Sequence, residues 1–236
     1  MQFASPLQPA TLLRRYKRFL ADAELKSGES VTVHCPNPGA MLGLAKPGAR
    51  IWLSHHGDGS RKLPWSWELT EADGGLVGIN TMLPNRLVAE ALAAGAIPEL
   101  ARYGEIAREV KVGSHSRIDF SLNGQGLPPC LVEVKNVHLR REAGLAEFPD
   151  SVTARGAKHL GVLAEAARQG VRAINFYLVQ RADCRRFAIA HDLDPAYAQA
   201  FGAALQAGVE VLCYGCDVTN TGVTLGPRME VNLEAN

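Results

Sequence analysis

Residues 116–135 read SRIDFSLNGQGLPPCLVEVK, and this segment decides the fold. Apolar and polar residues alternate on both sides of its Gly- and Pro-rich middle. The apolar positions are Ile118, Phe120, Leu122, Val132 and Val134. Alternation with a period of two is typical of a half-buried strand, and the middle of the segment carries turn-forming residues. The segment is therefore expected to form a β-hairpin with one apolar face.

The polar face of the predicted hairpin carries two carboxylates and an amine. If the turn is symmetric about residues 125–127, Asp119 lies opposite Glu133, and Lys135 follows two residues later on the same face. Two carboxylates at this separation can hold one Mg²⁺ or Mn²⁺ ion, which would polarise a phosphate and lower the pKa of a bound water molecule. The lysine could orient or deprotonate that water. The alternative is a solvent-facing pair of strands with ordinary ion pairs.

The spacing D-x13-E-x-K resembles the active-site hairpin of the PD-(D/E)XK nuclease superfamily. The elements predicted around it are a helix at 84–94, strands at 106–112, 117–122 and 131–136, a helix from Asp150 or Ser151 to about 168, a strand at 171–179, a helix from Asp194 to about 208, and a strand at 209–214. Their order, α-β-β-β-α-β-α-β, is that of the restriction-endonuclease-like core. Such cores often carry a further acid on the first helix. Glu90 is the candidate here, and Glu109 on the first strand competes for this role.

The first 81 residues contain five short strand candidates separated by Gly, Pro and Asp. They lie at 12–25, 31–35, 50–54, 65–70 and 76–80. This pattern fits an OB-type β-barrel, and an SH3-like barrel fits nearly as well. The expected fold is therefore of the α/β (α+β) class, with a nucleic-acid-binding barrel at residues 1–81 and a nuclease-like domain at residues 82–236.

A basic run with interleaved aromatic residues is expected on the first of these strands. It contains Arg14, Arg15, Lys17 and Arg18, together with Tyr16 and Phe19. The cations would contact phosphates and the rings could stack on bases, so this run is the best local candidate for a nucleic-acid contact. A solvated strand face is an equal alternative.

Composition narrows the class of protein. The 25 Lys and Arg residues nearly balance the 24 Asp and Glu residues, which gives a net charge of +1 and no overall nucleic-acid signature. The sequence has no signal-peptide pattern and no long apolar segment, so we expect a cytoplasmic protein without a membrane partner. Cys213 and Cys216 form a CxxC, but positions three apart on a strand point to opposite faces, which favours a structural role over a zinc or redox site.

Further motifs extend along the chain: HCPNPGAM at 34–41, FPDSVT at 148–153 and RGAKHL at 155–160. Together with the basic run and the hairpin, they resemble the bacterial sugar fermentation stimulation protein A family over nearly the whole length. Members are described as DNA-binding proteins linked to sugar, notably maltose, metabolism. Pro38 and Asn136 depart from the residues usual in relatives, which are Thr and Ser, but Asp119, Glu133 and Lys135 are intact.

The resemblance also implies a role for the helix after the hairpin, which related nucleases use to approach the phosphate backbone. Arg155 and Lys158 would contact phosphates there, ahead of His159, and ordinary exposed cations are the alternative. Two functions follow. The first is an Mg²⁺-dependent nuclease that binds DNA without strong sequence preference, and the second is a non-catalytic DNA-binding regulator that retains the fold. Nucleases of this fold often form homodimers, so a homodimer is a further expectation.

Overall fold

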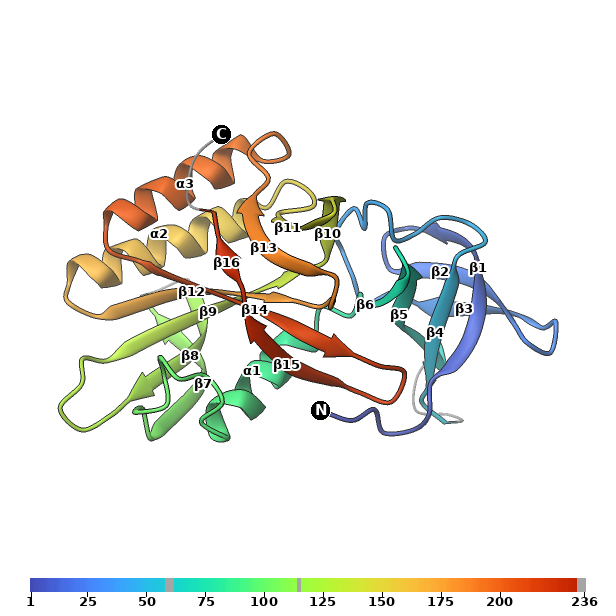
Figure 1. The fold of residues 1–236 in the computed structure, drawn as a ribbon, viewed down its shortest axis with the longest axis horizontal. Helices are drawn as coiled ribbons and strands as arrows, with labels where there is room; N and C mark the ends of the chain where they lie inside the picture. Colours follow the sequence, from blue (N-terminus) through green and yellow to red (C-terminus); the bar gives the residue numbers. More distant parts are fainter. Residues whose placement is uncertain (58–61, 114–115, 233–236) are drawn as a thin grey trace.

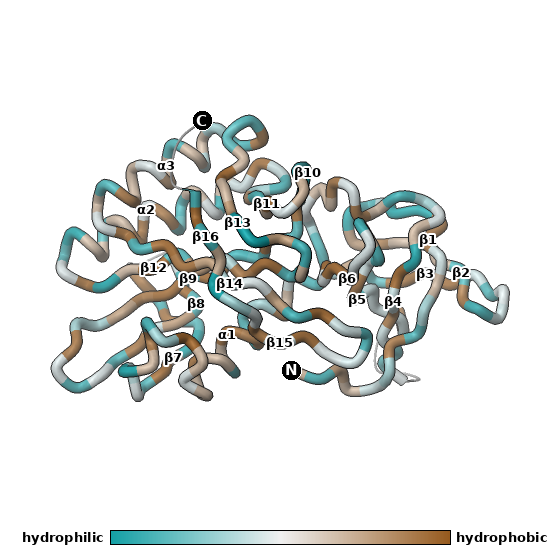
Figure 2. Tube along the Cα trace, viewed as in Figure 1, coloured by the Kyte–Doolittle hydropathy of each residue, from teal (hydrophilic) through white to brown (hydrophobic). Residues whose placement is uncertain are grey.

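The computed structural model describes residues 1–57, 62–113 and 116–232. A β-barrel is followed by a sheet with helices on both faces, and the two parts lie side by side (Figure 1). Hydrophobic residues concentrate along the central strands of the sheet, and the loops at the periphery are mostly hydrophilic (Figure 2). Separate hydrophobic clusters lie inside the barrel and on each of the two faces of the sheet.

Six strands form the barrel region. They are β1 (Gln8–Tyr16), β2 (Leu20–Leu25), β3 (Ser30–His34), β4 (Arg50–His55), β5 (Trp65–Ala72) and β6 (Gly75–Gly78). Strand β1 pairs with both β2 and β4, and β3 meets β5 in parallel at His34 and Ser66. The strands β1 to β5 thus close in the order β1-β2-β3-β5-β4, with β6 added beyond β5. This is the OB topology, which settles the choice between the OB-type and SH3-like barrels.

Residues 12–25, which were expected to form one strand, form parts of two strands with a turn at residues 17–19. Lys17 and Arg18 take left-handed backbone angles, with φ of 49° and 62°, and so reverse the chain into a hairpin. The prediction of a single strand was wrong because this turn contains no Gly, Asn or Pro to mark it. Arg14, Arg15 and Tyr16 of the basic run therefore lie on β1, whereas Lys17 and Arg18 project from the exposed turn.

The rest of the chain is built on a six-stranded sheet in the order β15-β14-β12-β9-β8-β7. Its strands are β7 (Glu105–Val112), β8 (Ser116–Asn123), β9 (Cys130–Val137), β12 (Arg172–Val179), β14 (Glu210–Val218) and β15 (Val223–Arg228). Helix α1 (Pro84–Ala93) covers one face, and helices α2 (Ala154–Arg168) and α3 (Pro195–Gln206) cover the other (Figure 1). Strands β9, β12 and β14 run parallel, because helices connect them.

Alternate residues of the central strands enter two hydrophobic clusters, one on each face of the sheet. Phe176 of β12 packs on the α1 side and its neighbour Tyr177 on the α2 and α3 side. On β14, Cys216 lies in the first cluster and Cys213 in the second, so the two thiols lie on opposite faces. Burial raises the pKa of Cys216 to about 12. The prediction that these two positions point to opposite faces of the strand is therefore confirmed.

A second sheet, which the sequence did not predict, has the order β10-β11-β13-β16. Its strands are β10 (Leu139–Glu142), β11 (Gly144–Phe148), β13 (Cys184–Ile189) and β16 (Glu230–Val231). These strands are short, and β10, with the sequence LRRE, lacks an alternating apolar pattern. They widen the predicted core without changing the order of its elements.

Helix α2 begins later than expected. Its N-cap is Thr153, whose side chain accepts a hydrogen bond from the backbone N–H of Gly156 at 3.2 Å. The prediction of Asp150 or Ser151 as the cap was wrong because Asp150 is engaged elsewhere. Its Oδ2 accepts hydrogen bonds from the backbone N–H of Met41 at 2.8 Å and from His138 Nε2 at 3.1 Å.

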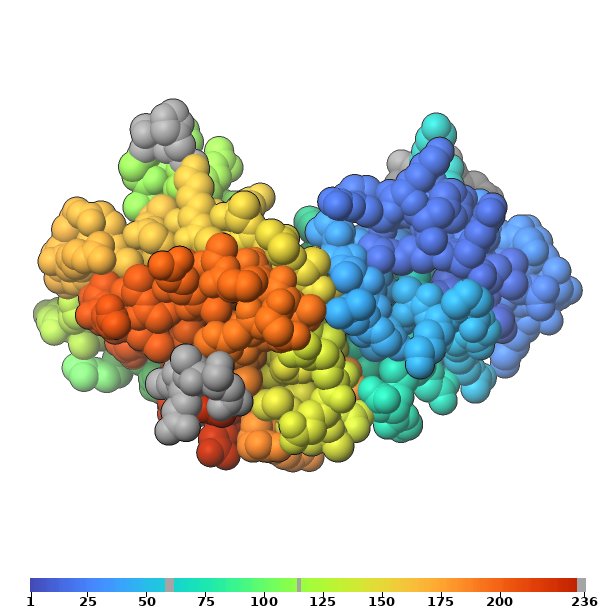
Figure 3. Space-filling view, turned by 90° about the horizontal axis from the view of Figure 1, so that it is seen from above, coloured from blue at the N-terminus to red at the C-terminus, as the bar shows by residue number. Residues whose placement is uncertain are grey.

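The contact between Met41 and Asp150 is one of several polar links between the barrel and the sheet domain. In another, the buried Arg181 donates to Asp73 in the turn after β5 at 2.8 Å and to Asp183 at 2.6 Å. Close packing accompanies the first link, because a Cβ atom at Gly39 would lie 2.6 Å from the Asp150 carboxylate. The two parts touch along this boundary and leave a hollow between them on one side (Figure 3).

Replacing Asp150 with asparagine is expected to lower the free energy of unfolding by roughly 2 kcal/mol at neutral pH. Burial alone would raise the pKa of Asp150, but the hydrogen bond and charge of His138 and the N–H of Met41 lower it from 3.8 to about 2. A carboxyl with a lowered pKa stabilises the fold above its unfolded-state pKa and loses that contribution as the pH falls through its folded-state pKa. In urea titrations at decreasing pH, the difference between wild type and variant should shrink below about pH 4. A difference that stays constant would contradict this role.

Candidate active site

Asp119 of β8 and Glu133 of β9 lie at the point where the two strands separate. The paired stretch of the hairpin ends at Phe120 and Val132, so the next position on each strand is Asp119 and Glu133. Asp119 Oδ2 accepts a hydrogen bond from the backbone N–H of Val134 at 2.8 Å, which holds the carboxylate against β9. This register is the one predicted from a symmetric turn.

Glu133 is 3% exposed, and its two carboxylate oxygens have different surroundings. Oε1 accepts a hydrogen bond from Lys135 Nζ at 2.6 Å and contacts His159 Nδ1 of α2. Oε2 is buried and has no hydrogen-bond partner within the described residues. A buried carboxylate oxygen without a partner is strongly disfavoured, and a bound cation would satisfy it.

The charges around the two carboxylates differ as well. Burial and the neighbouring charge of Glu133 raise the pKa of Asp119. Burial acts in the same direction on Glu133, but the hydrogen bond from His159 and the charge of Lys135 outweigh it and lower the pKa of Glu133. Two carboxylates in one buried site repel each other, and a cation between them would remove that repulsion.

The donor set suits a hard divalent cation. Asp119 and Glu133 supply oxygen atoms only, which is the ligand type that Mg²⁺, Mn²⁺ and Ca²⁺ prefer. Across residues 1–57, 62–113 and 116–232, no group of three or more His, Cys, Asp or Glu side chains could hold a metal ion. The remaining ligands of a cation here would have to be backbone carbonyls and water molecules.

Helix α1 contributes Asn85 to the site, not Glu90. Asn85 Nδ2 donates to Asp119 Oδ1 at 2.7 Å. Glu90 instead pairs with the amino group of Met1 at 2.9 Å, and its side chain is 53% exposed. Glu109 lies on β7 beside Asp119, between the pairs Arg108–Phe120 and Val110–Ile118, with a left-handed φ of 53°. The structure therefore does not bring Glu90 to the acidic pair.

His159 is the residue whose position differs most from expectation. It was placed last among the phosphate contacts of α2, but it lies on the buried face of that helix with Leu160 and Leu163 and bonds to Glu133. The helical spacing of His159 with the apolar residues was the only available signal, and that spacing is equally typical of a core histidine. In the structure its Nδ1 contacts the Glu133 carboxylate from α2.

The predicted nucleic-acid residues fall into three groups. Arg14 pairs with Asp22 at 2.7 Å, and Arg15 donates to backbone carbonyls of the loop at 37–40. Lys17 and Arg18 lie on the exposed turn between β1 and β2. Arg155 and Lys158 are exposed in the first turns of α2.

No helix among the described residues is long and apolar enough to cross a membrane.

Comparison with known proteins agrees with both halves of the fold. Residues 13–79 match the SfsA N-terminal OB domain, and residues 82–222 match the sugar fermentation stimulation protein RE domain. A sugar fermentation stimulation protein homolog of Dinoroseobacter shibae is 58% identical, over 100% of this chain and 97% of the relative. A homolog of Agrobacterium fabrum is 53% identical, over 98% of this chain and 97% of the relative.

A solved structure is similar over the same extent. SfsA of Pyrococcus furiosus, whose structure was determined in complex with Ca²⁺, has a TM-score of 0.89 and 27% identity, with 98% of each chain covered. Fold and comparisons define a protein in which an OB barrel precedes a restriction-endonuclease-like domain. The chain belongs to the sugar fermentation stimulation protein (SfsA) family.

Proposed function

We propose that this protein is a divalent-metal-dependent nuclease that acts on DNA. The observation that carries the proposal is the buried Oε2 atom of Glu133, which lacks a protein partner and lies on the strand position opposite Asp119. The Ca²⁺ in the Pyrococcus furiosus relative supports a divalent cation in this family. Asp119 and Glu133 would hold Mg²⁺ or Mn²⁺, which would supply Lewis-acid activation of the phosphate.

The chain's own residues would perform the remaining steps. Lys135 Nζ, on a side chain that is 11% exposed, is positioned beside Glu133 to orient an attacking water molecule and to stabilise negative charge on the phosphate. His159 and Asn85 would hold the two carboxylates in their orientations from opposite faces of the sheet. Because these contacts involve both helices that flank the hairpin, the site would be rigid before substrate binds.

DNA would be held by cations of both parts. The proposed contacts are Arg14, Arg15, Lys17 and Arg18 of the barrel and Arg155 and Lys158 of α2. These side chains would bind phosphates and give affinity without strong sequence preference. The protein would act on DNA in the cytoplasm. The connection of the family with sugar fermentation would be a consequence of this action on DNA.

The proposal predicts nucleic-acid cleavage that depends on a divalent cation. Wild-type protein incubated with single- and double-stranded DNA and RNA should cut at least one of them in Mg²⁺ or Mn²⁺. Addition of EDTA should stop cleavage, because the carboxylate pair alone cannot activate a phosphate. Gel analysis of the products is the measurement, and cleavage that persists in EDTA would contradict the proposed chemistry.

A non-catalytic DNA-binding regulator is the second candidate. The observation that favours it is the small ligand set, since the described residues offer two carboxylates and no third acid or histidine to a metal. Under this alternative, wild type would shift DNA in a gel but cut none of the substrates in either metal. Lys135 would then be part of a buried ion-pair cluster with no chemical role.

A further inference from the structure

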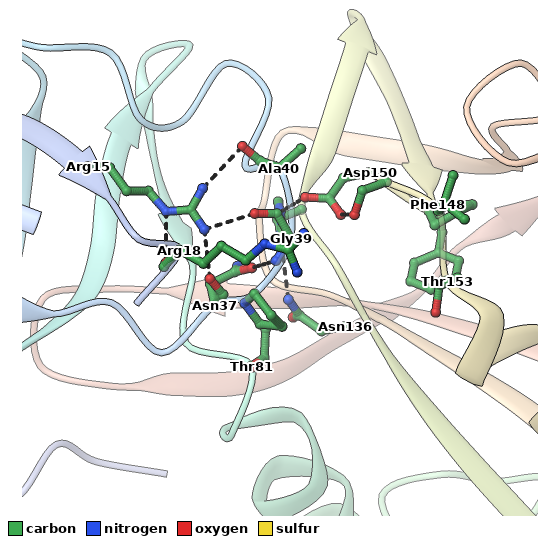
Figure 4. A pocket seen from close by; sticks show the side chains of 15 residues that line it. Arg15, Arg18, Asn37, Gly39, Ala40, Thr81, Asn136, Phe148, Asp150 and Thr153 are labelled. Atoms are coloured by element: carbon green, nitrogen blue, oxygen red, sulfur yellow. Dashed lines mark hydrogen bonds and ion pairs between the residues drawn. The ribbon is translucent and has the colours of Figure 1, made fainter. Parts of the chain in front are cut away.

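A pocket of about 690 Å³ lies between the barrel and the sheet domain (Figure 4). Arg15, Arg18 and the loop at 37–40 line it on the barrel side. The segment 148–153 lines it on the other side, together with Asn136 at the end of β9. None of the described residues that line the pocket is Asp119, Glu133 or Lys135, although Asn136 directly follows Lys135 on β9.

Arg15 builds the barrel wall of this pocket. Its Nη2 donates to the carbonyl oxygens of Asn37 at 2.8 Å and Gly39 at 2.9 Å, and its Nε donates to the carbonyl oxygen of Arg18 at 3.2 Å. These acceptors are neutral, so within the described chain no carboxylate offsets the charge of Arg15. The same bonds fix the turn that carries Arg18 beside the loop.

Arg18 extends from this turn into the pocket (Figure 4). Arg14, four residues earlier, is paired with Asp22 at 2.7 Å, whereas the Arg18 side chain has no hydrogen bond or ion pair with any residue that the structure describes. A guanidinium at a domain boundary with five free donors is suited to an anionic ligand.

Asp150 is the acid on the opposite wall, and its oxygens are already occupied. Oδ2 accepts from the N–H of Met41 and from His138, and Oδ1 accepts from Ser151 Oγ at 3.2 Å. In the structure this carboxylate makes no hydrogen bond or ion pair with Arg18. Two arginines face one satisfied acid, and the lining keeps a net positive charge.

Two features of the fold indicate the class of anion. The turn between the first two strands of an OB barrel is a usual contact for oligonucleotides, and Arg18 lies on that turn. The opposite wall ends at Thr153, the N-cap of α2, and the N-terminus of a helix favours negative charge. Arginine binds phosphate oxygens in a bidentate manner.

We propose that this pocket binds a phosphate group of a nucleic-acid strand, so that the barrel and the nuclease-like part hold the same strand. The inference rests on the proposed function, because it takes nucleic acid to be the substrate. The phosphate can come from a strand end or from an internal phosphodiester, and both present the same oxygen atoms to Arg18.

The test measures binding without cleavage. Fluorescence anisotropy in EDTA would compare DNA strands with a 5′-phosphate, a 3′-phosphate or hydroxyl ends, and a circular strand as competitor. Arg18→Gln removes the charge and keeps the length of the side chain. The matched control is Lys26→Ala, which removes one charge from an exposed turn of the same barrel outside the pocket lining. Thermal unfolding would show that both variants remain folded.

Arg18→Gln is expected to weaken DNA binding roughly tenfold and to reduce the slope of log affinity against log salt by about one, whereas Lys26→Ala should change affinity less than about twofold. If Arg18→Gln weakens binding only of strands that carry a terminal phosphate, the pocket binds the phosphate of a strand end. If it weakens binding of all strands equally, the circular strand included, the pocket binds an internal phosphodiester. Unchanged binding of every strand by Arg18→Gln, or an equal loss in Lys26→Ala, would overturn the proposal.

Failure of this inference is distinguishable from failure of the proposed function. If Arg18→Gln binds all strands as tightly as wild type while wild type still cleaves DNA in Mg²⁺, only the phosphate pocket is refuted. If wild type neither binds nor cleaves any nucleic acid, the proposed function fails and the pocket proposal fails with it.

Discussion

Asp119→Asn is expected to reduce cleavage by roughly a thousandfold or more, which corresponds to about 4 kcal/mol of lost transition-state stabilisation. The substitution removes one of two charged oxygen donors from the proposed cation site. It should preserve the local structure, because an asparagine oxygen can still accept from the N–H of Val134 and the Asn85 amide can turn to accept from the new NH₂ group. DNA affinity should stay the same or rise, since a negative charge near phosphates is lost.

The matched control for this variant is Asp217→Asn, at an exposed position near the end of β14. It makes the same chemical change away from the site and should leave single-turnover cleavage within about twofold of wild type. If Asp119→Asn retained wild-type cleavage in Mg²⁺, Asp119 would have no part in catalysis, and the acidic pair would be a structural feature of the hairpin.

Lys135→Ala is expected to reduce cleavage by roughly a hundredfold, the effect usual for loss of a general base or an electrostatic stabiliser. Its effect on metal binding should be opposite to that of Asp119→Asn. Lys135 Nζ lies 2.6 Å from Glu133 Oε1, so its removal takes one positive charge away from a metal-binding carboxylate. Divalent cations should therefore bind at least as tightly to the variant as to wild type.

This contrast separates a chemical role of Lys135 from a structural one. Calorimetric titration with Mn²⁺ and single-turnover cleavage would be measured on the same preparation, with Lys46→Ala, at an exposed barrel position, as the control for loss of one amine. Weakened metal binding together with lost cleavage would mean that Lys135 only supports Glu133. Unchanged cleavage would remove Lys135 from the proposed mechanism.

The hairpin could be predicted from the sequence because the residues that determine it lie within one short segment. Period-two alternation placed Ile118 and Phe120 on β8 and Val132 and Val134 on β9, and the near symmetry of the turn fixed the register at Phe120–Val132. The start of α3 followed from a local signal too, because Asp194 accepts a hydrogen bond from the N–H of Tyr197 as the N-cap. Local signals also predicted the barrel, because Gly, Pro and Asp separate its strands everywhere except between β1 and β2.

The surroundings of the acidic pair could not be predicted, because they depend on contacts between distant segments. Asn85 is 34 residues from Asp119, and His159 is 26 residues from Glu133. Neither an asparagine after a helix-starting proline nor a histidine on an apolar helix face identifies its partner. The turn at Lys17 and Arg18 was missed for a different reason, since non-glycine residues with positive φ leave no mark in the sequence.

The motif HCPNPGAM at residues 34–41 forms part of the contact between the barrel and the sheet domain. Asn37 is buried and donates to the carbonyl oxygen of Ile79 at 2.8 Å, and the loop then passes Gly39 and Met41 to reach Asp150. Asp150 bonds to His138, and His138 Nδ1 lies 3.0 Å from Asn136 Nδ2, next in sequence to Lys135. A continuous set of hydrogen bonds thus joins the barrel loop to the strand that carries the proposed catalytic residues.

The central claim is that Asp119 and Glu133 hold a divalent cation, and anomalous diffraction from crystals soaked in Mn²⁺ tests it most directly. The expected result is one strong peak within coordination distance, about 2.2 Å, of an oxygen of each carboxylate, with only oxygen ligands around it. Crystals of Asp119→Asn treated in the same way should lose the peak. A wild-type map without a peak between Asp119 and Glu133, at Mn²⁺ concentrations that occupy other sites, would contradict the account.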